Sequence, residues 1–136
     1  GIVLDAEIGK CWGPTLTIDH GTGTDGKPLI VLYVHLGAFD VKQGQNIRRG
    51  QIVGRLGTNH NDFKCIYGVR HLHLQIGRRA KLNGKGSSWG HVRFLEDGKR
   101  GVNPHLYWAD GPGKITCYDK RKKYPARTLT YPVRCD

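Results

Sequence analysis

The sequence contains no methionine and no apolar stretch close to the ~20 residues that a membrane-spanning helix needs. It also lacks a run of apolar residues at helical spacing that is long enough to predict a helix. It has no RRM, zinc-finger or helix-turn-helix pattern, which argues against a nucleic-acid-binding protein. Glycine is abundant instead, with 20 of the 136 residues, and hydrophobic residues make up 38%. These features predict a turn-rich, all-β domain that is large enough for a hydrophobic core.

None of the four cysteines forms a Cys-x-x-Cys pair, the usual spacing of a structural zinc site. Four cysteines allow three disulfide pairings, and the alternative is four reduced thiols in a cytosolic protein. We favour Cys117 with Cys135, because these two bracket a basic, proline-containing tail that has little else to hold it. Cys11 then pairs with Cys65. Disulfides predict a secreted protein, either extracellular or periplasmic.

Short apolar or alternating runs separated by glycine-rich segments are typical of strands and turns. Gly21–Gly26 is predicted to connect two antiparallel strands. The strands are expected at Ile2–Asp5, Thr15–Asp19, Leu29–His35, Gln51–Leu56 and His71–Ile76.

His71 and His73 lie two residues apart in a segment that alternates polar and apolar residues. In a strand, residues at i and i+2 point to the same face, so the two imidazoles would stand side by side while Leu72 and Leu74 face a core. Such a pair could bind a metal or take part in catalysis. The alternative is an exposed polar face that happens to carry two histidines. A third histidine, His35, ends the apolar run that begins at Leu29.

Four motifs occur together in a fixed order. They are Tyr33-Val-His35-Leu, the glycine-spaced segment 41–57, His71-Leu-His73-Leu and Val102-Asn-Pro-His-Leu-Tyr107. In this order the sequence resembles the lysostaphin/LytM-type zinc metalloendopeptidases, which cut the cross-links of bacterial peptidoglycan. The resemblance runs from about Gly1 to Trp108. It implies an antiparallel β-sheet peptidase domain with long connecting loops over residues 1–110, followed by a basic, disulfide-tied extension over residues 111–136.

Within that resemblance, His73 is a zinc ligand, and His35 and His71 are catalytic residues that handle protons and stabilise charge at the scissile peptide. A catalytic zinc typically has three protein ligands and one position for water. Imidazole suits proton transfer because its pKa lies near ~6.5. The resemblance also implies that His20, at the mouth of the Gly21–Gly26 loop, is structural.

The family takes its other two zinc ligands from an H-x-x-x-D motif, and this sequence has none. The residues four positions after its seven histidines are Thr24, Phe39, Lys64, Gln75, Gly77, Leu95 and Ala109. In the family this motif precedes the segment that resembles Gly1-Ile-Val-Leu. We therefore expect either that the chain starts inside the domain or that it is a degenerate homologue that lost the metal.

Basic residues outnumber acidic ones by 22 to 11, a formal charge of +11. Such a charge attracts polyanions. Anionic cell-wall polymers and peptidoglycan peptides are the expected partners of a monomeric protein, and a small basic nucleic-acid-binding domain is a more distant alternative. Within the family, the first alternative to an active endopeptidase is an inactive relative that binds cell wall or another protein.

Several other residues are candidates for the edge of the site. Residues 77–90 form a predicted loop that could be a wall of the substrate groove. Trp89, Tyr107 and Trp108 could contact a peptide, although aromatic residues more often belong to the core. His91 and His105 are interpreted as surface or capping histidines.

Overall fold

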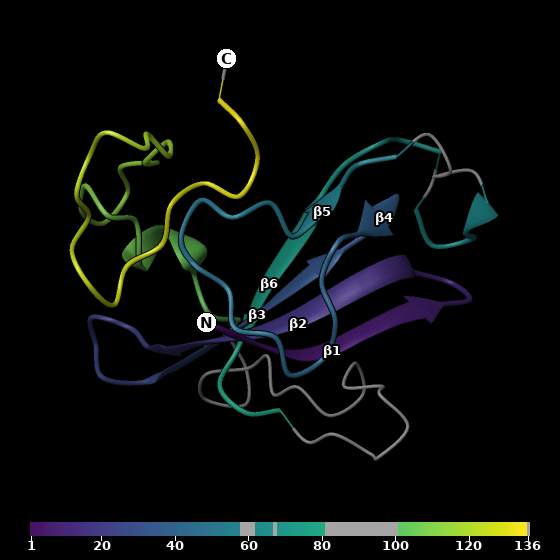
Figure 1. The fold of residues 1–136 in the computed structure, drawn as a ribbon, viewed down its shortest axis with the longest axis horizontal. Coiled ribbons are helices and arrows are strands. Elements are labelled where there is room, and N and C mark those ends of the chain that lie inside the picture. The colour runs from purple at the N-terminus through teal and green to yellow at the C-terminus, as the bar shows by residue number, and fades with distance from the viewer. Residues whose placement is uncertain (58–61, 67, 81–100, 136) are drawn as a thin grey trace.

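The computed structural model describes residues 1–57, 62–66, 68–80 and 101–135, and the elements of this part are strands and one 3-10 turn (Figure 1). The predicted all-β class is confirmed. No helix in the described ranges is long and apolar enough to cross a membrane. In chain order the elements are β1 (Ile2–Gly9), β2 (Gly13–Thr22), β3 (Pro28–Val34), β4 (Ala38–Phe39), β5 (Gly54–Arg55), β6 (His73–Gly77) and η3 (Pro104–Leu106).

The main sheet is antiparallel, with the strand order β1-β2-β3-β6, and β4 pairs with β5 in a small second sheet. A turn between β2 and β3 lies inside the predicted Gly21–Gly26 connection, where the Gly23 N–H donates to the Lys27 carbonyl at 2.9 Å. Strand β6 pairs with β3 although residues 35–72 separate them in the sequence, and Val34 is opposite His73. The register therefore places the start of β6 beside the end of β3.

The two faces of the sheet carry different residues, because side chains alternate along a strand and paired residues point to the same side. Leu32 and Val34 lie on the face of His73, which we call the histidine face. Val31 and Tyr33 lie on the opposite face. Leu32, Val34 and Val31 are all fully buried. The apolar run in β3 is continuous because both of its faces are covered.

Most of the core lies on the opposite face. One cluster there consists of Val3, Leu16, Ile18, Leu36, Val41 and Ile47, and the other of Leu29, Val31, Ile76, Tyr107, Trp108 and Leu129. Tyr107 and Trp108 are only 1% and 3% exposed, so the suggestion that they contact a peptide is wrong. Their side chains fill the core because residues 107–109 form a short ladder with Leu129: the Leu129 N–H donates to the Tyr107 carbonyl at 2.6 Å.

The predicted strand at Gln51–Leu56 is wrong for most of its length, since only Gly54–Arg55 pairs, with β4. The backbone explains the difference. Gly50 has a φ of +78°, and residues 48–51 form a turn in which the Gln51 N–H donates to the Arg48 carbonyl at 3.1 Å. This short apolar segment is therefore a turn followed by an extended stretch of which only two residues pair. The strand predicted at His71–Ile76 begins two residues later than expected, since β6 starts at His73 and His71 lies before it.

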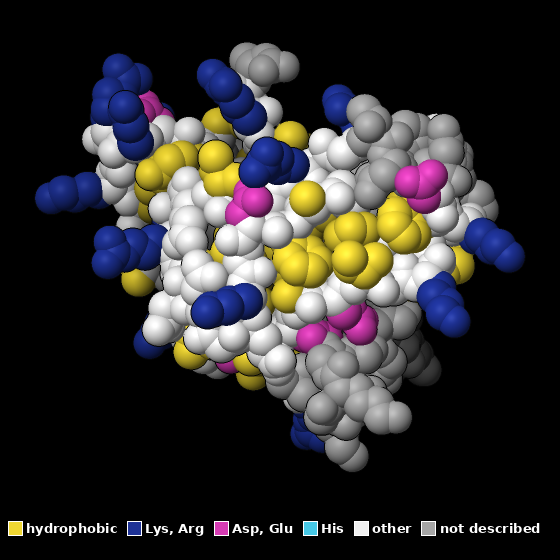
Figure 2. All heavy atoms as spheres, turned by 45° about the vertical axis from the view of Figure 1, so that its right-hand side comes forward, with side chains coloured by type: hydrophobic (Ala, Val, Ile, Leu, Met, Phe, Trp, Pro, Cys, Tyr) yellow, Lys and Arg dark blue, Asp and Glu magenta, His cyan; other side chains and the backbone are white. Residues whose placement is uncertain are grey.

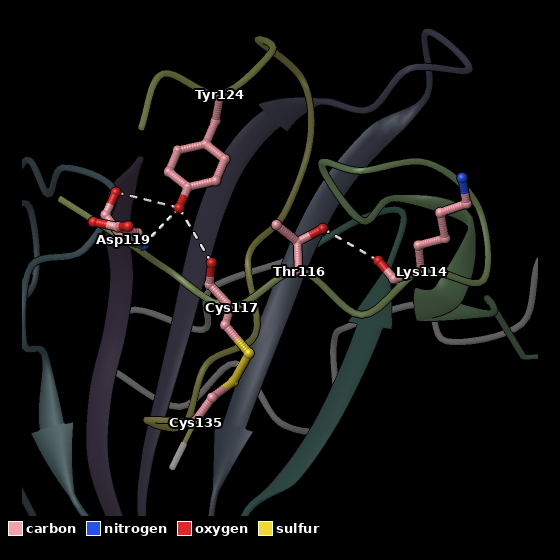
Figure 3. Close-up of a disulfide and its surroundings, with 6 residues drawn as sticks. All are labelled: Lys114, Thr116, Cys117, Asp119, Tyr124 and Cys135. Atoms are coloured by element: carbon pink, nitrogen blue, oxygen red, sulfur yellow. Dashed lines mark hydrogen bonds between the residues drawn. A yellow bond between two sulfur atoms is a disulfide. The ribbon is translucent and has the colours of Figure 1, made fainter. Parts of the chain in front are cut away.

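Both predicted disulfides are confirmed, with Cα–Cα distances of 5.0 Å for Cys11–Cys65 and 6.0 Å for Cys117–Cys135. The second holds the C-terminal segment, residues 111–135 (Figure 3). Inside the loop that it closes, the Tyr124 hydroxyl donates to the Cys117 carbonyl at 3.1 Å. Closing a loop of this length stabilises a protein by roughly 3 kcal/mol.

Arg49 joins the C-terminal segment to the rest of the molecule. Its guanidinium donates to the Thr128 carbonyl at 2.8 Å and lies 5.2 Å from the centre of the Tyr124 ring. The side chain thus combines a hydrogen bond with a cation–π contact. A division of the chain at residue 110 remains a prediction.

His20 lies on the opposite face, with Nε2 3.0 Å from the Tyr33 hydroxyl. Burial lowers the pKa of His20 to about 4; the N-terminal ammonium also lowers it and Asp19 opposes the change. The unfolded chain binds a proton here below pH ~6.5, whereas the folded protein does so only near pH 4. The stabilisation is therefore complete above pH ~6.5 and declines as pH falls toward 4, by up to about 3 kcal/mol.

We expect the variant His20→Gln, which keeps a hydrogen-bond acceptor for Tyr33, to lose less stability between pH 7.5 and pH 4.5 than the parent protein. Urea unfolding at both pH values measures the difference. Equal losses in the two proteins would contradict this role of His20.

Candidate functional site

Three histidines come from the adjacent ends of two strands. His35 follows the last residue of β3, His73 is the first residue of β6, and His71 lies two residues before it. Because Val34 is paired with His73, the backbones of the three residues lie near one another, although strand alternation alone would point His35 to the face opposite His73. His35 has a φ of +67°, a left-handed conformation that is uncommon for a residue with a side chain, and it turns the chain away from the sheet at this point.

The rings of His35, His71 and His73 converge. The ring centre of His35 is 4.8 Å from that of His71 and 5.7 Å from that of His73, and both pairs meet edge to face. His35 is 5% exposed, whereas His71 is exposed and His73 is partly buried. The cluster thus extends from a buried imidazole to one in contact with solvent.

Hydrogen bonds fix which nitrogen of each ring is free. Nδ1 of His35 lies 3.0 Å from the Trp12 carbonyl, and Nδ1 of His71 lies 2.7 Å from the Val69 carbonyl. A carbonyl oxygen only accepts, so in both rings Nδ1 carries the hydrogen. Nε2 is therefore the nitrogen that can take up a proton in His35 and His71.

Burial lowers the pKa of His35 below its ordinary value, and the charges of His71 and His73 lower it further, against the opposing effect of the Trp12 carbonyl. His35 is consequently neutral at neutral pH, with a lone pair on Nε2. A neutral imidazole with a fixed tautomer is the form that acts as a general base.

Trp12 also belongs to the site, although no motif or spacing in the sequence selects it. Its indole stacks on His35 with ring centres 5.4 Å apart and meets the edge of His73 at 6.2 Å. Its carbonyl also receives the His35 hydrogen bond. The neighbouring Cys11 is bonded to Cys65, and the Cys65 N–H donates to the Cys11 carbonyl at 3.0 Å. The disulfide thereby holds the turn that carries Trp12.

The resemblance implies a catalytic zinc, so we compared the side chains near His73 with the ligands that such a zinc needs. His73 is the ligand assigned in this chain, and its Nε2 lies 3.1 Å from Oε1 of Gln75, which leaves Nδ1 as the nitrogen with a lone pair. Across the described residues, no group of three or more His, Cys, Asp or Glu is placed to share a metal ion. A catalytic zinc needs three protein ligands. These residues therefore fit a zinc site only in part.

The remaining candidates lie away from this cluster or outside the described part. His105, on η3, accepts a hydrogen bond from Trp108 Nε1 at 3.0 Å, in keeping with a structural histidine. Trp89, His91 and most of the predicted loop 77–90 fall outside the described residues.

The sequence also matches a known family. A sequence profile described as "Peptidase family M23" matches residues 1–88, which include all three clustered histidines. The chain belongs to peptidase family M23. The resemblance to the lysostaphin/LytM-type enzymes is therefore confirmed, as is a β-sheet domain of that type.

This M23 chain is also similar to a chain in the "Structure of the SpoIIQ-SpoIIIAH pore forming complex", with 26% identity and a TM-score of 0.47. The similarity covers 57% of this chain and 44% of that one, so the present chain spans less than half the length of its structural relative. No curated protein matches the sequence.

Proposed function

We propose that this M23 domain serves a zinc-dependent endopeptidase that hydrolyses peptide bonds in bacterial peptidoglycan. The observation that supports it is the neutral, tautomer-fixed His35 beside His71 and His73 in a chain of a peptidase family. The two disulfides and the basic charge suit a secreted protein acting on an anionic wall.

The histidines would divide the work of hydrolysis. Nε2 of His35 accepts a proton from the attacking water, because this ring is buried and neutral with its hydrogen on Nδ1. Nε2 of the more exposed His71 carries no hydrogen in the neutral ring, so it would first take up a proton from solvent and then donate it to the oxygen where negative charge develops or to the leaving amine. When bound, zinc would polarise the scissile carbonyl and lower the pKa of water.

Zinc would bind through His73 only together with two donors that the 136 residues do not supply as an H-x-x-x-D motif. We expect the purified 136-residue chain to hold far less than one zinc per molecule and to leave sacculi intact. A longer chain that carries H-x-x-x-D ahead of Gly1 should bind zinc and clear sacculi, and His73→Ala should remove both properties. Metal analysis and turbidity of purified sacculi are the two measurements.

Stoichiometric zinc and His73-dependent clearing by the 136-residue chain would mean that other residues complete the site. If the longer chain binds zinc through His73 and still leaves sacculi intact, the endopeptidase proposal fails. The second candidate, an inactive relative that binds cell wall or a protein partner, would then be preferred. The incomplete donor set among the described residues is the observation that favours it.

A further inference from the structure

A groove of about 1280 Å³ lies on the face of the sheet opposite the histidines. Tyr33 lines its floor. Val34 is paired with His73 and shares its face, so the neighbouring Tyr33 points to the opposite face. Its walls are residues 47–56 on one side and residues 117–121 and 127–135 of the C-terminal segment on the other. We call it the cationic groove. It exceeds the roughly 300–1,000 Å³ of a small-molecule pocket, so its size suits a length of polymer.

The cationic groove is lined by an excess of positive charge. Asp119 is its single acidic lining residue in the described part of the chain, and it is paired with Arg121 at 3.0 Å. Arg55 is paired with Asp40 at 3.1 Å, and Arg49 bonds to the Thr128 carbonyl. Four lining cations have no ion-pair partner among the described residues: Arg48, Lys120, Arg127 and Arg134. Unpaired charges of one sign around a concavity attract carboxylates or other anions.

The same groove carries exposed apolar side chains. Ile52 is 73% exposed, Tyr118 43%, Tyr131 39% and Val133 37%, and all four line it. Figure 2 shows hydrophobic side chains gathered across one face of the molecule, with Lys and Arg side chains around its rim and some Asp and Glu side chains beside the patch. Apolar patches with a polar rim mark interaction sites.

We infer that the cationic groove binds an extended acidic polypeptide segment, whose apolar side chains contact the exposed apolar side chains of the walls and whose carboxylates meet Arg48, Lys120, Arg127 and Arg134. These apolar walls favour a peptide over a polyphosphate-like polymer, which would gain only from the cations. The two walls favour a chain over a lipid surface, which cannot enter a groove. This inference depends neither on zinc nor on hydrolysis, since the groove lies on the other face of the sheet.

The test uses a fluorescein-labelled ten-residue peptide of alternating Glu and Leu. The full 136-residue chain is titrated into this peptide, and the fluorescence anisotropy of the peptide reports binding. We expect binding to this peptide and much weaker binding to Gln-Leu and Glu-Ser peptides of the same length. Arg48→Gln/Lys120→Gln and, separately, Ile52→Ser should each weaken binding by about tenfold.

The matched controls are Lys42→Gln/Lys114→Gln and Ile8→Ser, which change exposed residues outside the groove and should leave the affinity unchanged. Thermal unfolding of each variant checks that it is folded; if Ile52→Ser is not, Val133→Ser takes its place. Three results would overturn the inference: equal binding of Glu-Ser peptide or sodium polyphosphate, no effect of the groove variants, or binding to phosphatidylglycerol vesicles without binding to the peptide.

Discussion

Replacing His35 with alanine is expected to lower the hydrolysis of peptidoglycan peptides by about two to four orders of magnitude without lowering zinc content. The measurement requires a longer chain that carries the missing donors and is active. The reason is that His35 supplies a neutral Nε2 whose tautomer is fixed by the Trp12 carbonyl. Alanine removes the proton acceptor and leaves His73 in place.

The pH profile gives a second readout. Because burial lowers the pKa of His35, hydrolysis that needs the neutral ring should persist below pH ~6.5 and decline only at a lower pH. His105→Gln, a change at a histidine on η3, is the control and should leave rate and profile unchanged. If His35→Ala removed zinc as completely as His73→Ala, His35 would be a ligand and its assignment to proton transfer would be wrong.

Gly50→Ala is expected to destabilise the protein by about 2–4 kcal/mol. Gly50 has a φ of +78°, where a side chain is strained. A Cβ there would also overlap the ring of Tyr118, which packs over this turn. The Tyr118 ring, which is 43% exposed, would have to turn away from the added methyl group and give up its packing on this turn.

Gly44→Ala separates the two costs, because Gly44 has a φ of +80° and open space where its Cβ would lie. This control should lose only the backbone cost of about 1–2 kcal/mol. In the Tyr118→Ala background the ring is absent, so Gly50→Ala should cost less free energy of unfolding there than it costs in the parent protein. Chemical unfolding measures the four variants and the parent protein, and equal losses for Gly50→Ala and Gly44→Ala would show that Tyr118 does not resist the methyl group.

The histidine cluster could be predicted because its geometry depends on local rules. The spacing of His71 and His73 and the position of His35 at the end of an apolar run place three rings near one strand end. The Cys117–Cys135 pair followed from a C-terminal tail that needed a tether, and Cys11 with Cys65 was the pair that remained. The roles of the three histidines remain a prediction, since nothing in the geometry alone distinguishes a ligand from a base.

Other features depend on contacts between distant segments. Trp12 belongs to the site because the β1–β2 turn folds back on His35, which local sequence does not indicate. Gln51–Leu56 has the apolar residues of a short strand, but the turn at Gly50 precedes it and only two of its residues are paired. Tyr107 and Trp108 became core because Leu129 returns to pair beside them.

The strand order also bears on when the site forms during folding. β1, β2 and β3 are neighbours in sequence and in the sheet, so they can assemble through short turns. β6 joins β3 only after the whole of segment 35–72 has closed into a loop. Such non-local pairings carry the largest entropic barrier and form slowly. Since His73 is the first residue of β6, it should reach His35 in a late step, and a nascent chain would have its hairpins before it had its histidine cluster.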